Sequence, residues 1–224
     1  MTEVTKQPVT MIINKYFGFK QLNFLNDNKI GCVLAKEIND FTDNIMICSD
    51  PNKLWSIRVA AMTGKDFDLP SIIGVNNDAA IEWIKEQHNI EKRYIFMCSE
   101  YFESKICGRM HIDKFSTLIE ASCGDFKKFK HTIPDLSVIS YFDMSYSDIL
   151  NTQTISVTNK LRLIELAEKL KDLYAEEFEE YSNILYEFDF AFGYFQNTSE
   201  KELDLRIIGM RGYDLSQKKL FEKQ

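Results

Sequence analysis

The sequence lacks the features that mark several common protein classes. No apolar run approaches the roughly 20 residues that a membrane-spanning helix needs. The first ten residues, MTEVTKQPVT, lack the apolar core of a signal peptide. We therefore expect a cytoplasmic protein that does not bind membranes.

Cysteine and histidine patterns that hold disulfides or metals are also missing. None of the five cysteines forms a C-x-x-C pair, and all lie within apolar runs, which is typical of reduced, buried thiols. The three histidines, His88, His111 and His131, are spread along the chain without the spacing of metal ligands. A zinc site is therefore not expected.

The chain has no excess of positive charge. A net charge of −7 and a pI near 5.1 argue against a nucleic-acid-binding surface. A phosphate ligand would have to be held by a local group of basic residues. A hydrophobic content of 45% with 27% charged residues describes an ordinary globular protein, and 224 residues suffice for one large domain or two small lobes.

Short strand patterns dominate the chain, and helical periodicity is confined to three segments. We predict helices at residues 17–28, 78–87 and 159–178, the last with Thr158 as its N-cap. We predict strands at 30–38, 53–61, 94–102, 106–112, 117–121, 136–141, 185–192 and 203–210. A boundary near 88–93 would separate an N-terminal lobe, residues 1–90, from a C-terminal lobe, residues 91–224. The pattern indicates an α+β fold of two small lobes.

The most informative segment is YEFDFAF, residues 186–192. In a strand, side chains alternate between the two faces, so its four aromatic residues would share a buried face. Glu187 and Asp189 would share the other face, about 7 Å apart at Cα. Two such carboxylates suit Mg²⁺, which usually binds a protein through one or two carboxylates and the phosphates of a substrate. Arg211 could contact the same substrate phosphates. The alternative is an edge strand with two solvated acids, and these residues alone leave both readings open.

Six segments of the chain carry short motifs in a recognisable order. They are FGFK (17–20), IGCVLAKEI (30–38), WSIRVAA (55–61), FMCSEY (96–101), IEASCG (119–124) and the 186–192 strand followed by Met210-Arg211. Together they resemble the ATP-binding domain of the phosphoenolpyruvate synthase and pyruvate phosphate dikinase family, over roughly residues 12–212. The resemblance implies a compact, two-lobed ATP-grasp fold with antiparallel sheets, a long helix in the C-terminal half and nucleotide between the lobes.

The resemblance also implies roles for charged residues. Lys20 and Arg58 would contact the phosphates of ATP, since an arginine fork pairs bidentately with phosphate oxygens. Glu187 and Asp189 would hold Mg²⁺. Arg211, together with Arg58, would act catalytically by stabilising charge on the transferred γ-phosphoryl group.

The adenosine part of the nucleotide would meet the hinge between the lobes. Main-chain groups around Met97, Ser99 and Tyr101 would contact the adenine, and Glu120 would lie near the ribose or the metal. The chain departs from the family where two serines that follow the arginine are replaced by Val59 and Ala60. It also carries no segment for a phospho-accepting histidine domain or a phosphoenolpyruvate-binding barrel, so we do not expect the full dikinase reaction from this chain alone.

Several functions are compatible with these residues and motifs. The first is an ATP-grasp enzyme, a phosphotransferase such as a kinase or a ligase, which uses Mg²⁺-ATP on an unknown small-molecule or protein acceptor. The second is a degenerate ATP-grasp fold that serves as a protein-interaction, regulatory or viral accessory module, which the missing hydroxyl groups favour. The third is a plain α+β interaction module whose resemblance is accidental.

Overall fold

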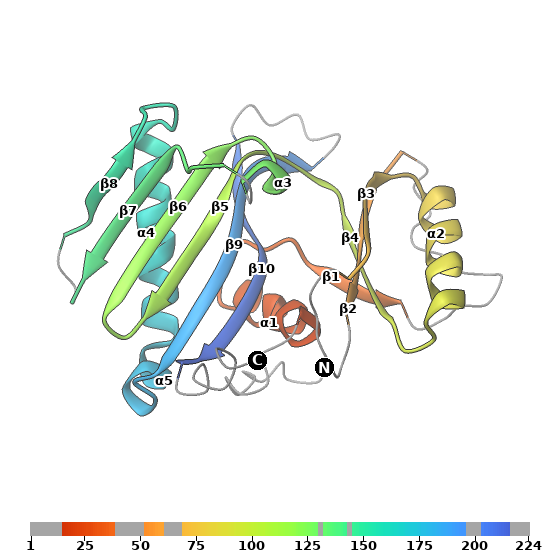
Figure 1. The fold of residues 1–224 in the computed structure, drawn as a ribbon, viewed down its shortest axis with the longest axis horizontal. Coiled ribbons are helices and arrows are strands. Elements are labelled where there is room, and N and C mark those ends of the chain that lie inside the picture. The colour runs from red at the N-terminus through yellow and green to blue at the C-terminus, as the bar shows by residue number, and fades with distance from the viewer. Residues whose placement is uncertain are drawn as a thin grey trace.

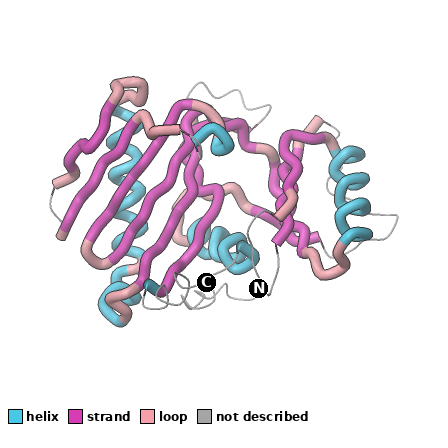
Figure 2. Tube along the Cα trace, in the orientation of Figure 1, coloured by secondary structure: helices cyan, strands magenta, loops and turns pink. Residues whose placement is uncertain are grey.

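Two antiparallel sheets organise the chain, and they appear as two separate groups of strands in Figure 2. The computed structural model describes residues 15–38, 52–60, 69–129, 132–142, 145–195 and 203–215, with the main chain alone for 15–20, 127 and 128. The sheets and the helices packed on them form the expected α+β architecture of two lobes (Figure 1). Every helix in these ranges is too short or too polar to cross a membrane.

The small sheet has the strand order β1-β4-β2-β3. Its strands are β1 (Ala35–Ile38), β4 (Ile95–Glu100), β2 (Trp55–Ala60) and β3 (Ser71–Val75). The helix α2 (Asn77–Ile90) covers one face, where Ile84 packs into a cluster with Ile57 and Phe96. The Asn76 side chain caps this helix by accepting a hydrogen bond from the Ala79 N–H at 3.0 Å.

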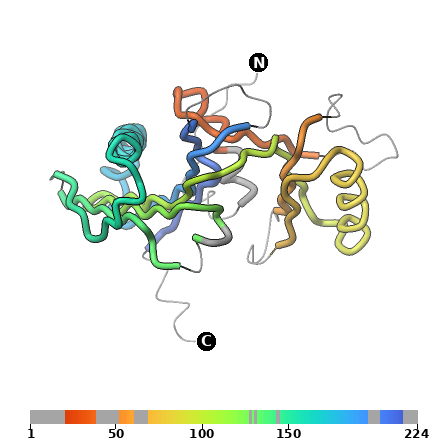
Figure 3. Tube along the Cα trace, turned by 90° about the horizontal axis from the view of Figure 1, so that it is seen from above, coloured from red at the N-terminus to blue at the C-terminus, as the bar shows by residue number. Residues whose placement is uncertain are grey.

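The large sheet has the strand order β10-β9-β5-β6-β7-β8. Its strands are β10 (Asp204–Asp214), β9 (Ile184–Phe195), β5 (Phe102–Asp113), β6 (Ser116–Cys123), β7 (Leu136–Tyr141) and β8 (Ser147–Asn151). The helices α1 (Lys15–Asp27) and α4 (Val157–Leu173) lie on the same side of it (Figure 3). The short helices α3 (Phe126–Phe129) and α5 (Ala175–Glu180) follow β6 and α4 along the chain.

The aromatic face of β9 forms the centre of the main core. Tyr186, Phe188, Phe190 and Phe192 are all fully buried, as the alternation in the sequence predicts. Leu163 and Leu170 of α4 belong to the same cluster. Burial of each large apolar side chain contributes on the order of 1.5–3 kcal/mol, so this face anchors β9 firmly. The odd-numbered residues of β9 are thereby held on the opposite face.

The predicted helix at 159–178 differs from the observed one in two respects. It is divided at Tyr174 into α4 and α5, because the backbone of Tyr174 leaves the helical region (φ −106°, ψ 13°). The N-cap is Ser156, whose hydroxyl group accepts from the Asn159 N–H at 3.2 Å, and not Thr158. The strands β3 and β8 were not among the predicted elements.

The chain passes between the sheets at Tyr101. Its N–H donates to the Leu54 carbonyl at 2.8 Å, and the large sheet begins at the next residue. The predicted lobe boundary at residue 90 therefore precedes β4, a strand of the small sheet. A second link joins the sheets, just before β1, where the chain runs beside β10 of the large sheet. The Val33 N–H donates to the Ile207 carbonyl and the Ile207 N–H donates to the Gly31 carbonyl, both at 2.9 Å.

Candidate functional site

The face of the large sheet opposite α1 and α4 carries a group of charged side chains. We call it the arginine–carboxylate cluster, formed by Arg58, Arg109, Glu187, Asp189 and Arg211. The register of the sheet creates it: Arg109 on β5 lies opposite Asp189 on β9, and Glu187 on β9 lies opposite Arg211 on β10. Paired residues of neighbouring antiparallel strands share a face, so four of these charges converge there.

Short ion pairs join these four side chains. The Arg109 Nε atom lies 2.8 Å from Asp189 Oδ1, and its Nη1 atom lies 3.3 Å from Glu187 Oε2. Arg211 Nη1 lies 3.0 Å from Glu187 Oε1. The side chain of Glu187 is only 7% exposed, against 28% for Arg211. The carboxylates therefore lie deeper than the guanidinium groups that neutralise them.

Arg58 reaches this cluster from the small sheet. It lies on β2, and its Nη1 atom donates a hydrogen bond to the main-chain oxygen of Ile208 on β10 at 3.1 Å. Burial lowers the pKa of Arg58, the negative charge of Asp189 opposes that effect, and the positive charge of Arg211 adds to it. An arginine stays charged in proteins in spite of such effects. Arg58 therefore brings a third positive charge to the two carboxylates.

The electrostatics of the cluster favour anions. Burial raises the pKa of Glu187; the positive charges of Arg109 and Arg211 oppose this rise, and Asp189 adds to it. For Arg211, burial alone would lower the pKa, but Asp189, Tyr213 and Glu187 outweigh it and raise the pKa. Three guanidinium groups surround the carboxylate pair, and Glu120 on β6, opposite Arg109 in the register, adds a third carboxylate to the same face. Arginine pairs well with planar oxygen anions such as phosphate.

Glu187 and Asp189 could hold Mg²⁺ only if the Arg109 guanidinium moved away from them. Glu187 and Asp189 offer the oxygen ligands that Mg²⁺ prefers, and a protein usually supplies one or two carboxylates while water and phosphate complete the shell. Within the described ranges, no group of three or more His, Cys, Asp and Glu side chains is arranged around a metal position. Because Arg109 now contacts both carboxylates, Mg²⁺ fits this pair only when that guanidinium moves away.

The remaining predicted site residues lie on three other elements and at the passage between the sheets. Met97 and Ser99 are in β4, which pairs with β1 on one side and β2 on the other, and Met97 contributes its side chain to the main core. Tyr101 lies at the passage between the sheets. Glu120 lies on β6, opposite Arg109 in the register. Lys20 is in α1, and its side chain falls outside the part of the structure that is described. The binding roles of these residues stay predictions.

Sequence reasoning missed Arg109. The signal was present, since Arg109 interrupts the apolar run Ile106–Ile112 much as Arg58 interrupts WSIRVAA. A charge within a core strand is rarely buried without a partner. Next to the site, the Arg109 guanidinium carbon lies 5.7 Å from the ring centre of Phe126 in α3, a cation–π contact.

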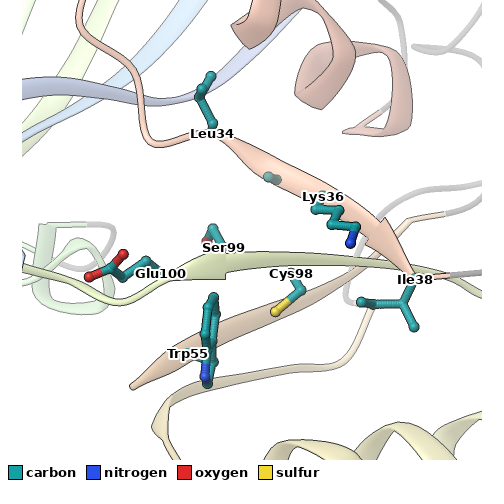
Figure 4. A pocket seen from close by; sticks show the side chains of 8 residues that line it. Leu34, Lys36, Ile38, Trp55, Cys98, Ser99 and Glu100 are labelled. Carbon is teal, nitrogen blue, oxygen red and sulfur yellow. The ribbon is translucent and has the colours of Figure 1, made fainter. Parts of the chain in front are cut away.

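A pocket of about 310 Å³ lies elsewhere, mostly on the α2 side of the small sheet (Figure 4). Its lining residues are Leu34, Ala35, Lys36, Ile38, Trp55, Cys98, Ser99 and Glu100. Cys98 and Glu100 point to the face of β4 opposite Met97, as alternation along a strand requires. The pocket contains no residue of the arginine–carboxylate cluster.

No family model matches the sequence, and no curated protein matches it significantly. The structure, in contrast, is similar to the ADP complex of PurK, an N5-carboxyaminoimidazole ribonucleotide synthetase, with a TM-score of 0.54 and 10% identity, over 93% of this chain and 47% of that one. It is also similar to an N5-carboxyaminoimidazole synthase from Aspergillus clavatus in complex with ADP and 5-aminoimidazole ribonucleotide (TM-score 0.54, 11% identity, 91% of this chain and 45% of that one).

The chain has an ATP-grasp fold. The prediction of an ATP-grasp domain is thereby confirmed, whereas a specific relation to phosphoenolpyruvate synthase or pyruvate phosphate dikinase stays a prediction. The chain spans less than half the length of the two solved structures. An identity near 10% supports the ATP-grasp fold alone, so the binding and activity of this chain stay proposals.

Proposed function

We propose that the protein binds Mg²⁺-ATP where the two sheets meet, with the phosphates at the arginine–carboxylate cluster. The observation that carries the proposal is the reach of Arg58 from the small sheet to the Ile208 carbonyl on β10, where the charges of Asp189 and Arg211 act on its guanidinium. Guanidinium groups from two sheets can donate hydrogen bonds to the phosphate oxygens of one oligophosphate from both sides. The two solved structures of similar fold named above hold ADP, which supports nucleotide binding by this fold.

The adenosine part would extend from the cluster toward Tyr101, where the chain joins the sheets. In this proposal Arg58, Arg109 and Arg211 hold phosphate oxygens, and Glu187 and Asp189 supply two Mg²⁺ ligands after Arg109 has moved. Bound Mg²⁺ would neutralise charge that develops on the phosphates. The protein would then phosphorylate or ligate an acceptor, because preorganised charges are the main requirement of phosphoryl transfer.

Isothermal titration with a non-hydrolysable ATP analogue and Mg²⁺ tests this proposal. A charge-assisted hydrogen bond contributes about 1.5–3 kcal/mol, so Arg58→Ala should weaken binding by roughly 10- to 100-fold. Asp189→Asn should weaken it in the presence of Mg²⁺. Arg58→Lys separates charge from fork geometry and should bind with intermediate affinity.

Two control variants each remove one charged side chain outside the arginine–carboxylate cluster. Arg93→Ala removes an exposed arginine next to α2, and Asp172→Asn removes an exposed acid in α4. Both should bind the analogue as the wild type does. Absence of binding at about 1 mM analogue, with the protein folded, would instead favour a non-catalytic interaction module.

A further inference from the structure

Arg109 contacts both carboxylates of the cluster at once. Its Nε atom pairs with Asp189 at 2.8 Å, and its Nη1 atom pairs with Glu187 at 3.3 Å. The register places Arg109 directly opposite Asp189, so the guanidinium reaches Glu187 diagonally across the pair. It therefore occupies the space between the two groups that a shared cation would need.

The surroundings hold Arg109 in this position without burying it completely. Its side chain is 21% exposed, and the ring of Phe126 lies on it at 5.7 Å. Asp189 is 15% exposed and Glu187 is 7% exposed, so the carboxylates lie beneath the guanidinium. Arg109 is therefore the most exposed of these three side chains.

We propose that Arg109 is a latch, which keeps Glu187 and Asp189 closed to a divalent cation until the phosphates of a nucleotide draw the guanidinium away. A guanidinium and a hydrated cation compete for the same carboxylate oxygens. The three guanidinium groups next to the carboxylate pair repel a free cation and attract an oligophosphate. Phosphate oxygens offer Arg109 an equivalent pairing, so the latch opens toward an anion. The opening step rests on the function proposed above, whereas the closed state does not.

Binding of Mn²⁺, measured by water proton relaxation in the absence of nucleotide, tests the closed state. The wild-type protein should bind Mn²⁺ weakly. Arg109→Met should bind it about tenfold more tightly or better, since Asp189 Oδ1 and Glu187 Oε2 then lose their guanidinium partner while Arg211 still pairs with Glu187 Oε1. Asp189→Asn in addition to Arg109→Met should remove the gain, which locates the ion at the carboxylate pair. Arg93→Met, the same change at an exposed arginine, should behave as the wild type.

A lysine variant keeps the test valid if Arg109→Met fails to fold. Arg109→Lys retains the charge but loses the fork that contacts two carboxylates, so it should show an intermediate gain. Equal Mn²⁺ affinity of the wild type and the folded Arg109 variants would overturn the proposal.

A second measurement tests the opening of the latch. A non-hydrolysable ATP analogue should raise Mn²⁺ binding to the wild-type protein and have less effect on Arg109→Met. An analogue that binds equally well with Mn²⁺ and with a chelator present would overturn the opening step. Failure of the proposed function looks different, because the analogue then gives no heat of binding in the wild type, whatever the variants do with Mn²⁺ alone.

Discussion

Arg58 in the small sheet donates a hydrogen bond to the carbonyl of Ile208 in the large sheet, over a distance of 3.1 Å. The acceptor is available because β10 has an irregular register there: Ile207 pairs with Phe190 and Gly209 with Asp189, which leaves Ile208 without a partner on β9. Bulges of this kind often lie next to binding sites, where they redirect a group. The contact thus joins the sheets at the edge of the charged cluster.

The affinity for adenine nucleotides should increase with the number of phosphates. ATP should bind more tightly than ADP by roughly tenfold, and AMP should bind most weakly, because each phosphate adds charge-assisted contacts to the guanidinium groups. Added salt should weaken the binding of ATP more than the binding of AMP, because ATP carries the larger charge and screening therefore reduces its attraction more. Titrations at two ionic strengths measure both effects. Equal affinity for AMP and ATP would place the phosphates away from the arginines.

Two buried tyrosines in ring contact should respond oppositely to removal of their hydroxyl groups. The Tyr174 hydroxyl accepts from Gln21 Nε2 at 2.9 Å and donates to the Met210 sulfur at 3.5 Å, so Tyr174→Phe should destabilise the protein by about 1–3 kcal/mol. The Tyr186 hydroxyl is buried and has no hydrogen-bond partner among the described residues. Tyr186→Phe should therefore leave the free energy of unfolding unchanged or raise it. Urea unfolding measures both, and a large loss in Tyr186→Phe would contradict the structure.

Two glycines of the large sheet should differ sharply in tolerance to alanine. A Cβ atom at Gly108 would lie 2.0 Å from the Glu120 carbonyl oxygen and 2.6 Å from the Phe190 ring, so Gly108→Ala should cost about 3 kcal/mol or more. At Gly209 the nearest atom would be Asp189 Oδ2 at 3.4 Å, an ordinary contact. Gly209→Ala should therefore cost less than about 1 kcal/mol. Thermal unfolding of the two variants compares them, and similar losses would show that β5 and β6 are not this close.

Stability should fall at alkaline pH. Burial raises the pKa of the thiols of Cys32, Cys98 and Cys107 from 9.0 to about 12. Between these values the unfolded chain has lost the thiol protons that the folded protein keeps. The stability that these thiols contribute is therefore complete below pH 9 and is lost as the pH rises toward 12, by up to about 1.4 kcal/mol per thiol and pH unit.

Urea unfolding at a series of pH values measures this loss. Cys32→Ala removes one of the thiols and should make the decline with pH shallower. Burial also raises the pKa values of Tyr174 and Tyr186 above 10.0, which adds a loss of the same sign that begins above about pH 10. A stability that stays constant from about pH 9 to pH 11 would show that the thiols are exposed.

Local patterns predicted much of the fold. The alternation in β9 predicted its buried aromatic face, and helical periodicity located α1, α2 and α4. The prediction failed where local signals are weak. The strand β8 is an exposed edge strand with only Leu150 partly buried, so it has no strong apolar alternation. The break at Tyr174 was missed because Tyr174 continues the apolar stripe while its backbone leaves the helix.

The candidate site was only partly accessible from the sequence. The resemblance placed Lys20 and Arg58 around one nucleotide together with Glu187, Asp189 and Arg211. The structure brings the side chains of these residues to one place, apart from Lys20, whose side chain lies outside the described part. The position of Arg109 in an apolar strand marked it as unusual, but its partners could not be assigned, because its contact with both carboxylates depends on the pairing of β5 with β9, and Arg109 and Asp189 lie 80 positions apart along the chain. Register between distant strands is set by the packing of the whole core, which no local pattern reveals.

A crystal structure with a non-hydrolysable ATP analogue and Mg²⁺ would show where the nucleotide lies. We predict phosphates within hydrogen-bonding distance of Arg58 and Arg211, the adenine near Tyr101, and Arg109 moved from Glu187 and Asp189 to a phosphate oxygen. An analogue bound on the α2 side, in the pocket that Trp55 and Cys98 line, with the Arg109 ion pairs intact, would contradict the proposed site.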